Sequence, residues 1–339
     1  MKSSSKRRDF SRLNSKMEKS ILALTVACLL LSPRLSEAQR VYRIGALVGE
    51  DQFVSAFEGF KKKMAALGYI EGKNIKYDFH NAKGDRDVLR KLAEKLVNDK
   101  HDVIVTSSTT ATVPVAKASA GTNIPVVFLS AGNPLRFVKS YSSSGNNLTG
   151  ISSSSLDLAE KRLELLKEIA PAIKRVIFVN NPMGENYEAY LRLTREAAKR
   201  LAFEVTEIEI RAGSGEEVKP RLPLITRKVG EAVLIPPDVP FVAVTEDIAQ
   251  QAIKERLPTV GPNVETVRRG YLVGYSSDYY SLGQQGAMLV DKILKGARPT
   301  DLPIEQPFKL SLVINLKTAK AIGLKIPKEI LLRADEVIQ

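Results

Sequence analysis

The sequence predicts an α/β protein made of two Rossmann-like lobes, each with a parallel sheet and helices on both faces. Short apolar runs of strand length alternate with amphipathic segments of helix length, in two successive series. Strands separated by helices of about 10–15 residues are typical of βαβ units, which build parallel sheets. Residues 142–155, rich in serine, separate the two series, so we expect a linker or a crossover there.

The first series opens with an apolar strand at residues 41–48, followed by an amphipathic helix. The apolar face of this helix recurs every three or four residues, as helical periodicity requires. Gly68 follows its last apolar position, where a glycine commonly ends a helix. The helix face consists of Phe53, Phe57, Phe60, Met64 and Leu67. The rest of the series is expected as strands at 74–79, 103–106 and 124–129, with helices at 88–96 and 109–120.

The second series repeats this alternation. Pro220 and Pro223 lie within its segment 215–229, and because proline inside a helix costs about 3 kcal/mol, we expect a short or irregular helix there. The other helices are expected at 158–169, 187–201, 245–256 and 282–294. The strands are expected at 175–179, 203–210, 231–235, 259–260 and 271–275.

The N-terminus resembles a secretory signal peptide. Lys19 precedes an uncharged apolar run at 21–31, and the small-x-small site Ser36-Glu37-Ala38 follows it. The run is too short to span a bilayer. We therefore expect residues 1–38 to be removed and the mature chain to be periplasmic or otherwise extracytoplasmic. Met17 is an alternative start.

Cys28 is the chain's single cysteine and admits two interpretations. Residues 25–28 loosely resemble a lipoprotein cleavage box, which would make Cys28 a lipid anchor. The apolar run continues past it, however, so we expect an ordinary signal residue. A mature chain without cysteine would have neither disulfides nor thiolate chemistry.

Composition argues against nucleic-acid binding. The net charge is +13, but basic residues alternate with acidic ones, and no block of like charge stands out. Only 6% of residues are aromatic and none is tryptophan, whereas nucleic-acid binding favours clustered basic residues with stacking aromatics.

Polar residues gather where the predicted parallel strands end, which is the edge at which open α/β sheets bind ligands. Amides and hydroxyls opening the helix at Thr109 could hold a carboxylate. Asp238, Asp278 or Glu50 could hold an ammonium group, and Tyr275 could flank an apolar group. Each could instead be an ordinary cap or turn residue. The candidate ligand-binding residues are Glu50, Ser107, Ser108, Thr109, Asn133, Asn181, Glu185, Asp238, Tyr275, Ser276 and Asp278.

Signatures of catalysis are missing from the sequence. No zinc-protease, serine-hydrolase, P-loop or dinucleotide motif occurs. The two histidines, His80 and His101, are expected to be solvated and away from the strand ends. We therefore expect a binding protein with no cofactor and no metal, and an enzyme on the same scaffold remains the alternative.

Three segments near the C-terminus carry a family resemblance: residues 290–296, 312–321 and 331–336. They resemble the end of the ABC-transporter substrate-binding proteins of the tryptophan/tyrosine type. Residues 67–74, 124–128 and 147–150 agree with the same family.

The resemblance implies a type I periplasmic-binding fold, with two lobes joined by three crossovers and a small ligand closed between them. By position, the family's cleft residues fall on most of the candidates above. Residues 39–151 and 274–306 would form the first lobe, and 152–273 and 307–339 the second.

The implied partners are a small polar, amino-acid-like ligand and a membrane permease, and the protein would be a monomer that binds no nucleic acid. Val239 follows Asp238 where the aromatic-amino-acid branch usually has asparagine, so the ligand's identity stays open. A ligand-sensing partner of a membrane receptor is a further alternative.

Overall fold

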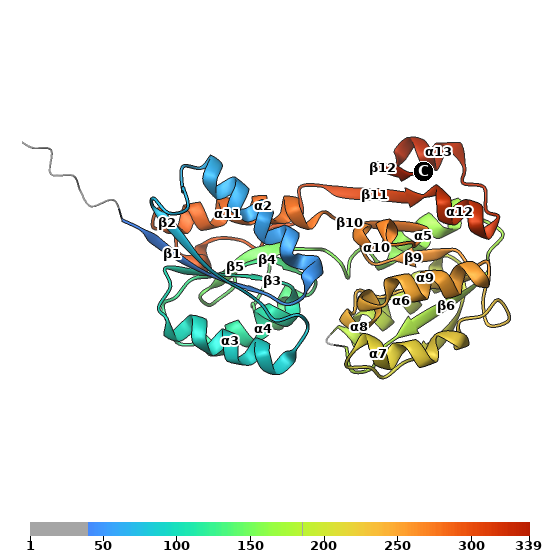
Figure 1. Ribbon diagram of the computed structural model, residues 1–339, viewed down its shortest axis with the longest axis horizontal. Coiled ribbons are helices and arrows are strands. Elements are labelled where there is room, and N and C mark those ends of the chain that lie inside the picture. The colour runs from blue at the N-terminus through green and yellow to red at the C-terminus, as the bar shows by residue number, and fades with distance from the viewer. Residues whose placement is uncertain (1–39, 185) are drawn as a thin grey trace, which may run out of the picture. The chain divides into compact units, whose positions relative to one another are not determined.

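The computed structural model describes residues 40–184 and 186–339, of which Tyr42–Gln339 form one compact unit. This unit contains two sheets, each covered by helices on both faces (Figure 1). The predicted signal peptide, with Cys28, lies outside the described residues, and so does Glu185. Among the helices that the structure describes, none is both long and apolar enough to span a bilayer.

The first lobe is built on a five-stranded parallel sheet in the order β2-β1-β3-β4-β5. The sequence predicts its alternation of strands and helices, but strand β5 lies inside the segment expected to be a linker. The elements are β1 (Tyr42–Val48), η1 (Asp51–Phe53), α2 (Val54–Ala66), β2 (Ile75–Asn81), α3 (Arg86–Asn98), β3 (Val103–Ser107), α4 (Thr109–Ala118), β4 (Val126–Ala131), η2 (Pro134–Arg136), β5 (Leu148–Ser152), α11 (Tyr279–Leu294) and η4 (Pro299–Asp301).

Alternation along β1 explains the two helix layers of this lobe. Ile44 and Ala46 face the core beneath α2 and α11, whereas Leu47 faces the core beneath α3 and α4. Successive side chains of a strand point to opposite faces, so a strand buried on both faces reads as a continuous apolar run. Helices α2 and α11 touch closely, because a Cβ atom on Gly283 would lie only 1.8 Å from the Ala56 carbonyl oxygen.

The second lobe is built on a seven-stranded sheet in the order β12-β11-β10-β9-β8-β6-β7. Its proline-containing segment forms the short helices α7 and η3, as the sequence predicts. The elements are α5 (Ala159–Ile169), β6 (Arg175–Asn180), α6 (Tyr187–Arg200), β7 (Glu204–Glu209), α7 (Gly215–Val218), η3 (Lys219–Leu224), β8 (Ala232–Leu234), α8 (Val239–Ala243), α9 (Thr245–Lys254), β9 (Thr259–Gly261), α10 (Val264–Arg268), β10 (Val273–Ser277), β11 (Leu310–Asn315), α12 (Leu316–Ile322), α13 (Lys328–Arg333) and β12 (Glu336–Ile338).

Two cores lie on opposite faces of this second sheet. Val176 and Phe178 of β6 pack toward α5 and α6, whereas Ile177 and Val179 pack toward α8 and α9. The sheet is parallel apart from the pairing of β10 with β11, which is antiparallel. That pairing arises where the chain returns from the first lobe to the second.

Within the described residues the chain crosses between the lobes three times, after β5, after β10 and before β11. The crossing segments bind one another: the Ser277 hydroxyl donates to the Ser153 carbonyl at 3.2 Å, and the Ser152 amide donates to the Glu305 carbonyl at 2.9 Å. The expected boundary at residue 274 falls too early, because β10 stays in the second sheet through Ser277. Together the three segments form the hinge.

Candidate functional site

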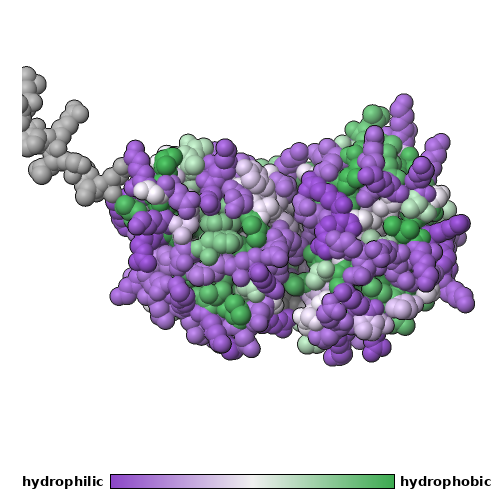
Figure 2. Space-filling model, in the orientation of Figure 1, coloured by the Kyte–Doolittle hydropathy of each residue, from purple (hydrophilic) through white to green (hydrophobic). Residues whose placement is uncertain are grey.

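Side chains from both lobes line a cleft with about 730 Å³ of empty space. A second hollow of about 490 Å³ continues it toward the hinge, since Thr110, Asn186, Pro237 and Val239 line both. The surface is hollowed where the lobes face each other (Figure 2). This is the edge at which the parallel strands end, as the sequence predicts.

The first lobe presents the N-terminus of α4 to the cleft. Ser108, at φ +90°, caps this helix: its hydroxyl oxygen accepts from the Ala111 amide at 3.1 Å. The Thr109 hydroxyl oxygen accepts from the Gly132 amide at 3.0 Å. Because a helix cannot bond its own first amides, those of Thr109 and Thr110 are suited to an anion.

Gly49 makes room for this cap. A Cβ atom at Gly49 would lie 2.5 Å from the Ser108 hydroxyl oxygen, which is too close for any larger residue unless Ser108 moves. Glu50, the next residue, lines the cleft with a side chain that is 7% exposed. The end of β1 therefore supplies a nearly buried carboxylate beside the start of α4.

The second lobe presents Asp238, which lies between β8 and α8. Its Oδ1 accepts from the Val239 amide at 3.0 Å and caps α8, and its Oδ2 accepts from Asn181 Nδ2 at 2.7 Å. Asn181 also donates to the Ala212 carbonyl at 2.9 Å and accepts from the Met183 amide at 3.1 Å. The amide of Asn181 is thus occupied in positioning Asp238 and the turn after β6.

An aromatic wall, which the sequence analysis missed, forms part of the cleft. It consists of Phe178 on β6 with Tyr187 and Tyr190 on α6, and the rings of Phe178 and Tyr190 lie 5.9 Å apart. In the sequence these residues fit the apolar periodicity of a strand and a helix, so they are indistinguishable from core residues.

Arg162 holds this wall from behind. Its side chain is fully buried and donates to the Tyr190 hydroxyl at 3.2 Å. It also donates to the carbonyls of Ser155 at 2.9 Å, Pro262 at 2.6 Å and Tyr275 at 3.2 Å. Four neutral acceptors therefore share one guanidinium group: one on α6, one in the hinge, one just after β9 and one within β10.

Asn180 and Asn186 bring unused amide atoms to the cleft. Asn180 is 1% exposed, and neither its Nδ2 nor its Oδ1 has a hydrogen-bond partner among the described residues; the same holds for Oδ1 of Asn186. Neither residue was among the candidates, although both lie beside Asn181 and Glu185. Their unpartnered state depends on spatial neighbours, which the sequence does not reveal.

The structure brings five of the eleven candidates to the cleft lining: Glu50, Ser108, Thr109, Asn181 and Asp238. Glu185 is not described. Ser107 is fully buried behind α4, and Asn133 precedes η2 without lining the cleft. Tyr275 packs its ring against the core between β10 and α5. A ligand contact by Ser107, Asn133 or Tyr275 therefore has no support from the lining of the cleft.

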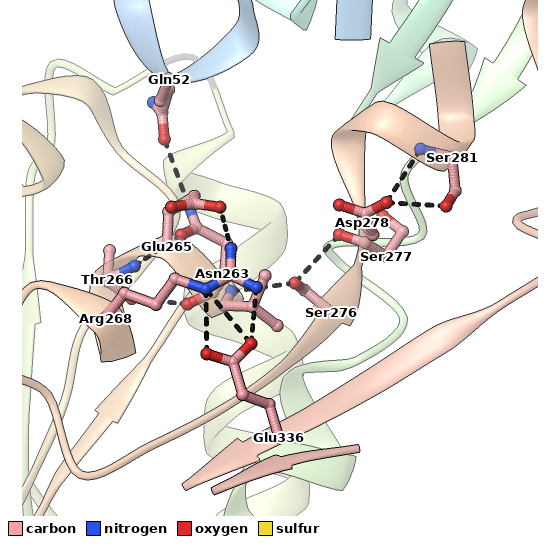
Figure 3. Close-up of polar contacts among 11 residues, drawn as sticks. Gln52, Asn263, Glu265, Thr266, Arg268, Ser276, Ser277, Asp278, Ser281 and Glu336 are labelled. Carbon is pink, nitrogen blue, oxygen red and sulfur yellow. Dashed lines mark hydrogen bonds and ion pairs between the residues drawn. The ribbon is translucent and has the colours of Figure 1, made fainter. Parts of the chain in front are cut away.

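The remaining two candidates, Ser276 within β10 and Asp278 just after it, are hydrogen-bonded near the hinge (Figure 3). The Ser276 hydroxyl accepts from the Val264 amide at 3.2 Å and donates to the Ser277 carbonyl. Asp278 caps α11 by accepting from the amide and hydroxyl of Ser281 at 2.9 and 2.7 Å. Asp278 is thus a helix cap, the alternative that the sequence left open, and Ser276 is a strand residue whose hydroxyl is bonded to backbone groups.

Figure 3 also shows a hydrogen bond between the lobes. Asn263 Nδ2 donates to Gln52 Oε1 at 3.2 Å, while Asn263 Oδ1 caps α10 through the Thr266 amide. Nearby, the rings of Tyr279 and Phe53 lie 4.8 Å apart. Burial raises the pKa of Tyr279 to about 12, so its hydroxyl is neutral at physiological pH.

The histidines lie away from the cleft lining, but one expectation about them is wrong. His101 is 5% exposed rather than solvated, because its Nδ1 lies 3.0 Å from the Leu96 carbonyl oxygen in the core beside α3. His80 is half-buried beside Asp78. In residues 40–184 and 186–339, no cluster of three or more His, Cys, Asp or Glu side chains could hold a metal ion.

A comparison with known proteins agrees with this architecture. The family described as ABC transporter substrate binding protein matches residues 43–338. A tyrosine-binding protein of Clostridioides difficile (strain R20291) is 29% identical over 295 residues, which cover 86% of this chain and 83% of that protein.

Two solved structures extend the comparison. An ABC domain from Streptococcus pneumoniae in complex with L-Trp is 24% identical, with a TM-score of 0.80. A ligand-free, open substrate binding protein with adhesive properties from Clostridium difficile is 25% identical, with a TM-score of 0.68. Each alignment covers 88% of this chain and 100% of the other. The family match spans nearly all of the described residues, so this chain belongs to the ABC transporter substrate binding proteins.

Proposed function

We propose that this protein captures an amino-acid-like zwitterion between its lobes, outside the cytoplasm, and delivers it to an ABC-transporter permease. The observation that supports this most is the arrangement of charge across the cleft. The first lobe offers the N-terminus of α4, which favours an anion, and the second offers the carboxylate of Asp238, which favours a cation.

A bound amino acid would place its carboxylate at the amides of Thr109 and Thr110, with Arg86 at the same edge. Its ammonium group would contact Asp238, and Glu50 would add a second nearly buried carboxylate. Its side group would lie against the wall of Phe178 and Tyr190. Charge-assisted hydrogen bonds contribute about 1.5–3 kcal/mol each, so both ends of the ligand would add to affinity.

The relatives support the same ligand class. One is named a tyrosine-binding protein, and one structure holds L-Trp, so an aromatic side group fits the wall that this chain presents. Closure of the lobes would bury the ligand, and the ligand would shift the open–closed equilibrium that the permease senses. The protein would act as a monomeric binding protein without a catalytic step.

Thermal unfolding of residues 39–339 with added ligands tests the proposal. L-Tyrosine and L-tryptophan should raise the unfolding midpoint, because a ligand at 100 times its Kd stabilises by about 2.7 kcal/mol. Tyramine lacks the carboxylate and 3-(4-hydroxyphenyl)propionate lacks the ammonium group, so both should shift the midpoint far less. Equal shifts with these analogues would contradict zwitterion recognition, and turnover of any ligand would contradict a binding role.

Export is tested separately. N-terminal sequencing of the exported protein should begin at Gln39, because the signal peptide would be cleaved after Ala38. Recovery of a lipid-modified Cys28 would contradict this and would indicate a membrane anchor. A control with Ala38→Arg, which removes the small residue at the cleavage site, should accumulate uncleaved precursor.

A further inference from the structure

Asn180 is the most unusual polar group of the cleft. It is the last residue of β6 and its side chain is 1% exposed, yet both polar atoms of its amide lack a partner among the described residues. Buried amides are almost always hydrogen-bonded, and an unpaired one destabilises a protein. A group of this kind that lines a ligand cleft points to a partner on the ligand.

The surroundings of Asn180 indicate which part of a ligand it would meet. Asn180 and Phe178 are two residues apart on one strand and so share a face of the sheet, the face covered by α6. Tyr187 and Tyr190 line the same part of the cleft. The amide therefore lies beside the aromatic wall, where the proposed function puts the side group of the ligand.

Asn180 differs from its neighbours because its side-chain donors and acceptor are not already hydrogen-bonded within the described residues. The side-chain amide of Asn181 is already hydrogen-bonded to Ala212, Met183 and Asp238. Asp238 in turn caps α8. An asparagine amide offers two donors and an acceptor, so it matches a group that both donates and accepts. A phenol hydroxyl does this, whereas a plain phenyl ring would leave both amide atoms unpaired.

We propose that Asn180 is a specificity-determining residue that selects ligands whose aromatic side group carries a hydroxyl. The inference rests on the proposed function, because it assumes an amino-acid-like ligand with its ring against the Phe178–Tyr190 wall. A site that hydrogen-bonds a ligand hydroxyl discriminates strongly against the analogue without it, since the buried polar group of the protein is then unpaired. The protein should bind L-tyrosine at least tenfold more tightly than L-phenylalanine.

Substitution of Asn180 by leucine, which is close in size but cannot hydrogen-bond, tests the role directly. Calorimetry should show that Asn180→Leu weakens L-tyrosine binding at least tenfold and leaves L-phenylalanine binding unchanged or tighter. The unfolding midpoint of the ligand-free variant should not fall, because the substitution removes an unpaired buried amide. If leucine prevents folding, Asn180→Val gives the same test with a smaller side chain.

Thr194→Val is the matched control. Thr194 lies on α6, is fully buried and has a hydroxyl without a partner among the described residues, but it does not line the cleft. It should change neither affinity nor the tyrosine preference.

Three results would overturn the inference, in two different ways. If the wild-type protein binds L-tyrosine and L-phenylalanine equally, or if Asn180→Leu keeps the tyrosine preference, the role of Asn180 is wrong while the proposed function stands. If the wild-type protein binds no amino acid, the proposed function fails and this inference fails with it. Loss of the preference in Asn180→Leu alone supports the assignment.

Discussion

The two lobes line one cleft, but they differ in how far their polar side chains are already hydrogen-bonded. In the first lobe the hydroxyls of Ser108 and Thr109 each accept from a backbone amide. In the second lobe Asn180 and Asn186 keep amide atoms without partners in the described part of the chain. The first lobe thus offers a helix N-terminus whose side-chain hydroxyls are already hydrogen-bonded, and the second offers side-chain amide atoms that have no partner in the described residues.

This difference suggests a division of labour. A helix N-terminus recognises any anion of suitable size, because its amides and dipole carry no information about the rest of the ligand. Side chains with a defined pattern of donors and acceptors, set in an aromatic wall, discriminate among side groups. We infer that the first lobe orients the common part of the ligand and the second lobe selects its identity.

The largest expected effect concerns the support behind the second lobe's wall. Arg162→Met should lower the free energy of unfolding by about 3 kcal/mol or more, because four buried acceptors lose their donor. Urea denaturation of the ligand-free protein measures this. The control Arg192→Met removes an exposed pair with Glu196 and should change the free energy of unfolding by no more than about 0.5 kcal/mol. Equal stability of both variants would show that the buried guanidinium does not hold the wall.

The next effect concerns the charge of the second lobe. Asp238→Asn keeps the shape of the side chain but removes its charge, so it should weaken L-tyrosine binding by about 2 kcal/mol, or roughly 30-fold. Calorimetry measures the change, with Glu204→Gln, an exposed residue of β7, as the control. If Asp238→Asn binds like the wild type, the ammonium group lies elsewhere, and a neutral polar ligand becomes the better proposal.

A smaller effect is expected from the first lobe. Ser108→Ala should lower the free energy of unfolding by about 1 kcal/mol, because α4 loses its cap. It should weaken ligand binding less than about threefold, since the backbone amides of α4 remain. Paired measurements of unfolding and affinity separate the two effects. A loss of affinity as large as that of Asp238→Asn would break the division of labour, because the Ser108 hydroxyl would then contact the ligand itself.

Much of the first lobe's contribution can be predicted from the sequence. The carboxyl ends of parallel strands meet at one edge, so locating β1 and β3 locates Glu50, Ser108 and Thr109. The same rule fails after β10. That strand pairs antiparallel with β11 and leads into the hinge, so Asp278 caps α11 instead of lining the cleft. Such pairing depends on a distant segment.

The selective part of the second lobe is harder to predict. Phe178 and Tyr190 fit core periodicity and are 1% and 2% exposed, so nothing in the sequence indicates that they also line the cleft. Asn180 resembles its neighbour Asn181 in sequence, yet one amide is unused and the other is fully bonded. Hydrogen-bond satisfaction is a property of three-dimensional surroundings, which explains why the sequence misses the residue that we propose to be selective.

The smallest expected effect tests the link between the lobes rather than either lobe. Gln52 of the first lobe accepts from Asn263 of the second at 3.2 Å, and a partly exposed hydrogen bond of this kind contributes about 0.5–1 kcal/mol. Gln52→Ala should shift the ligand-free protein toward open forms and weaken L-tyrosine and L-phenylalanine equally, by about two- to fivefold. X-ray scattering of the ligand-free protein and calorimetry measure the two changes, with the exposed Gln250→Ala of α9 as the control. The free-energy cost of closure is the same for every ligand. A change in the preference for L-tyrosine over L-phenylalanine would therefore mean that Gln52 helps to select the ligand, which would contradict the division of labour between the lobes.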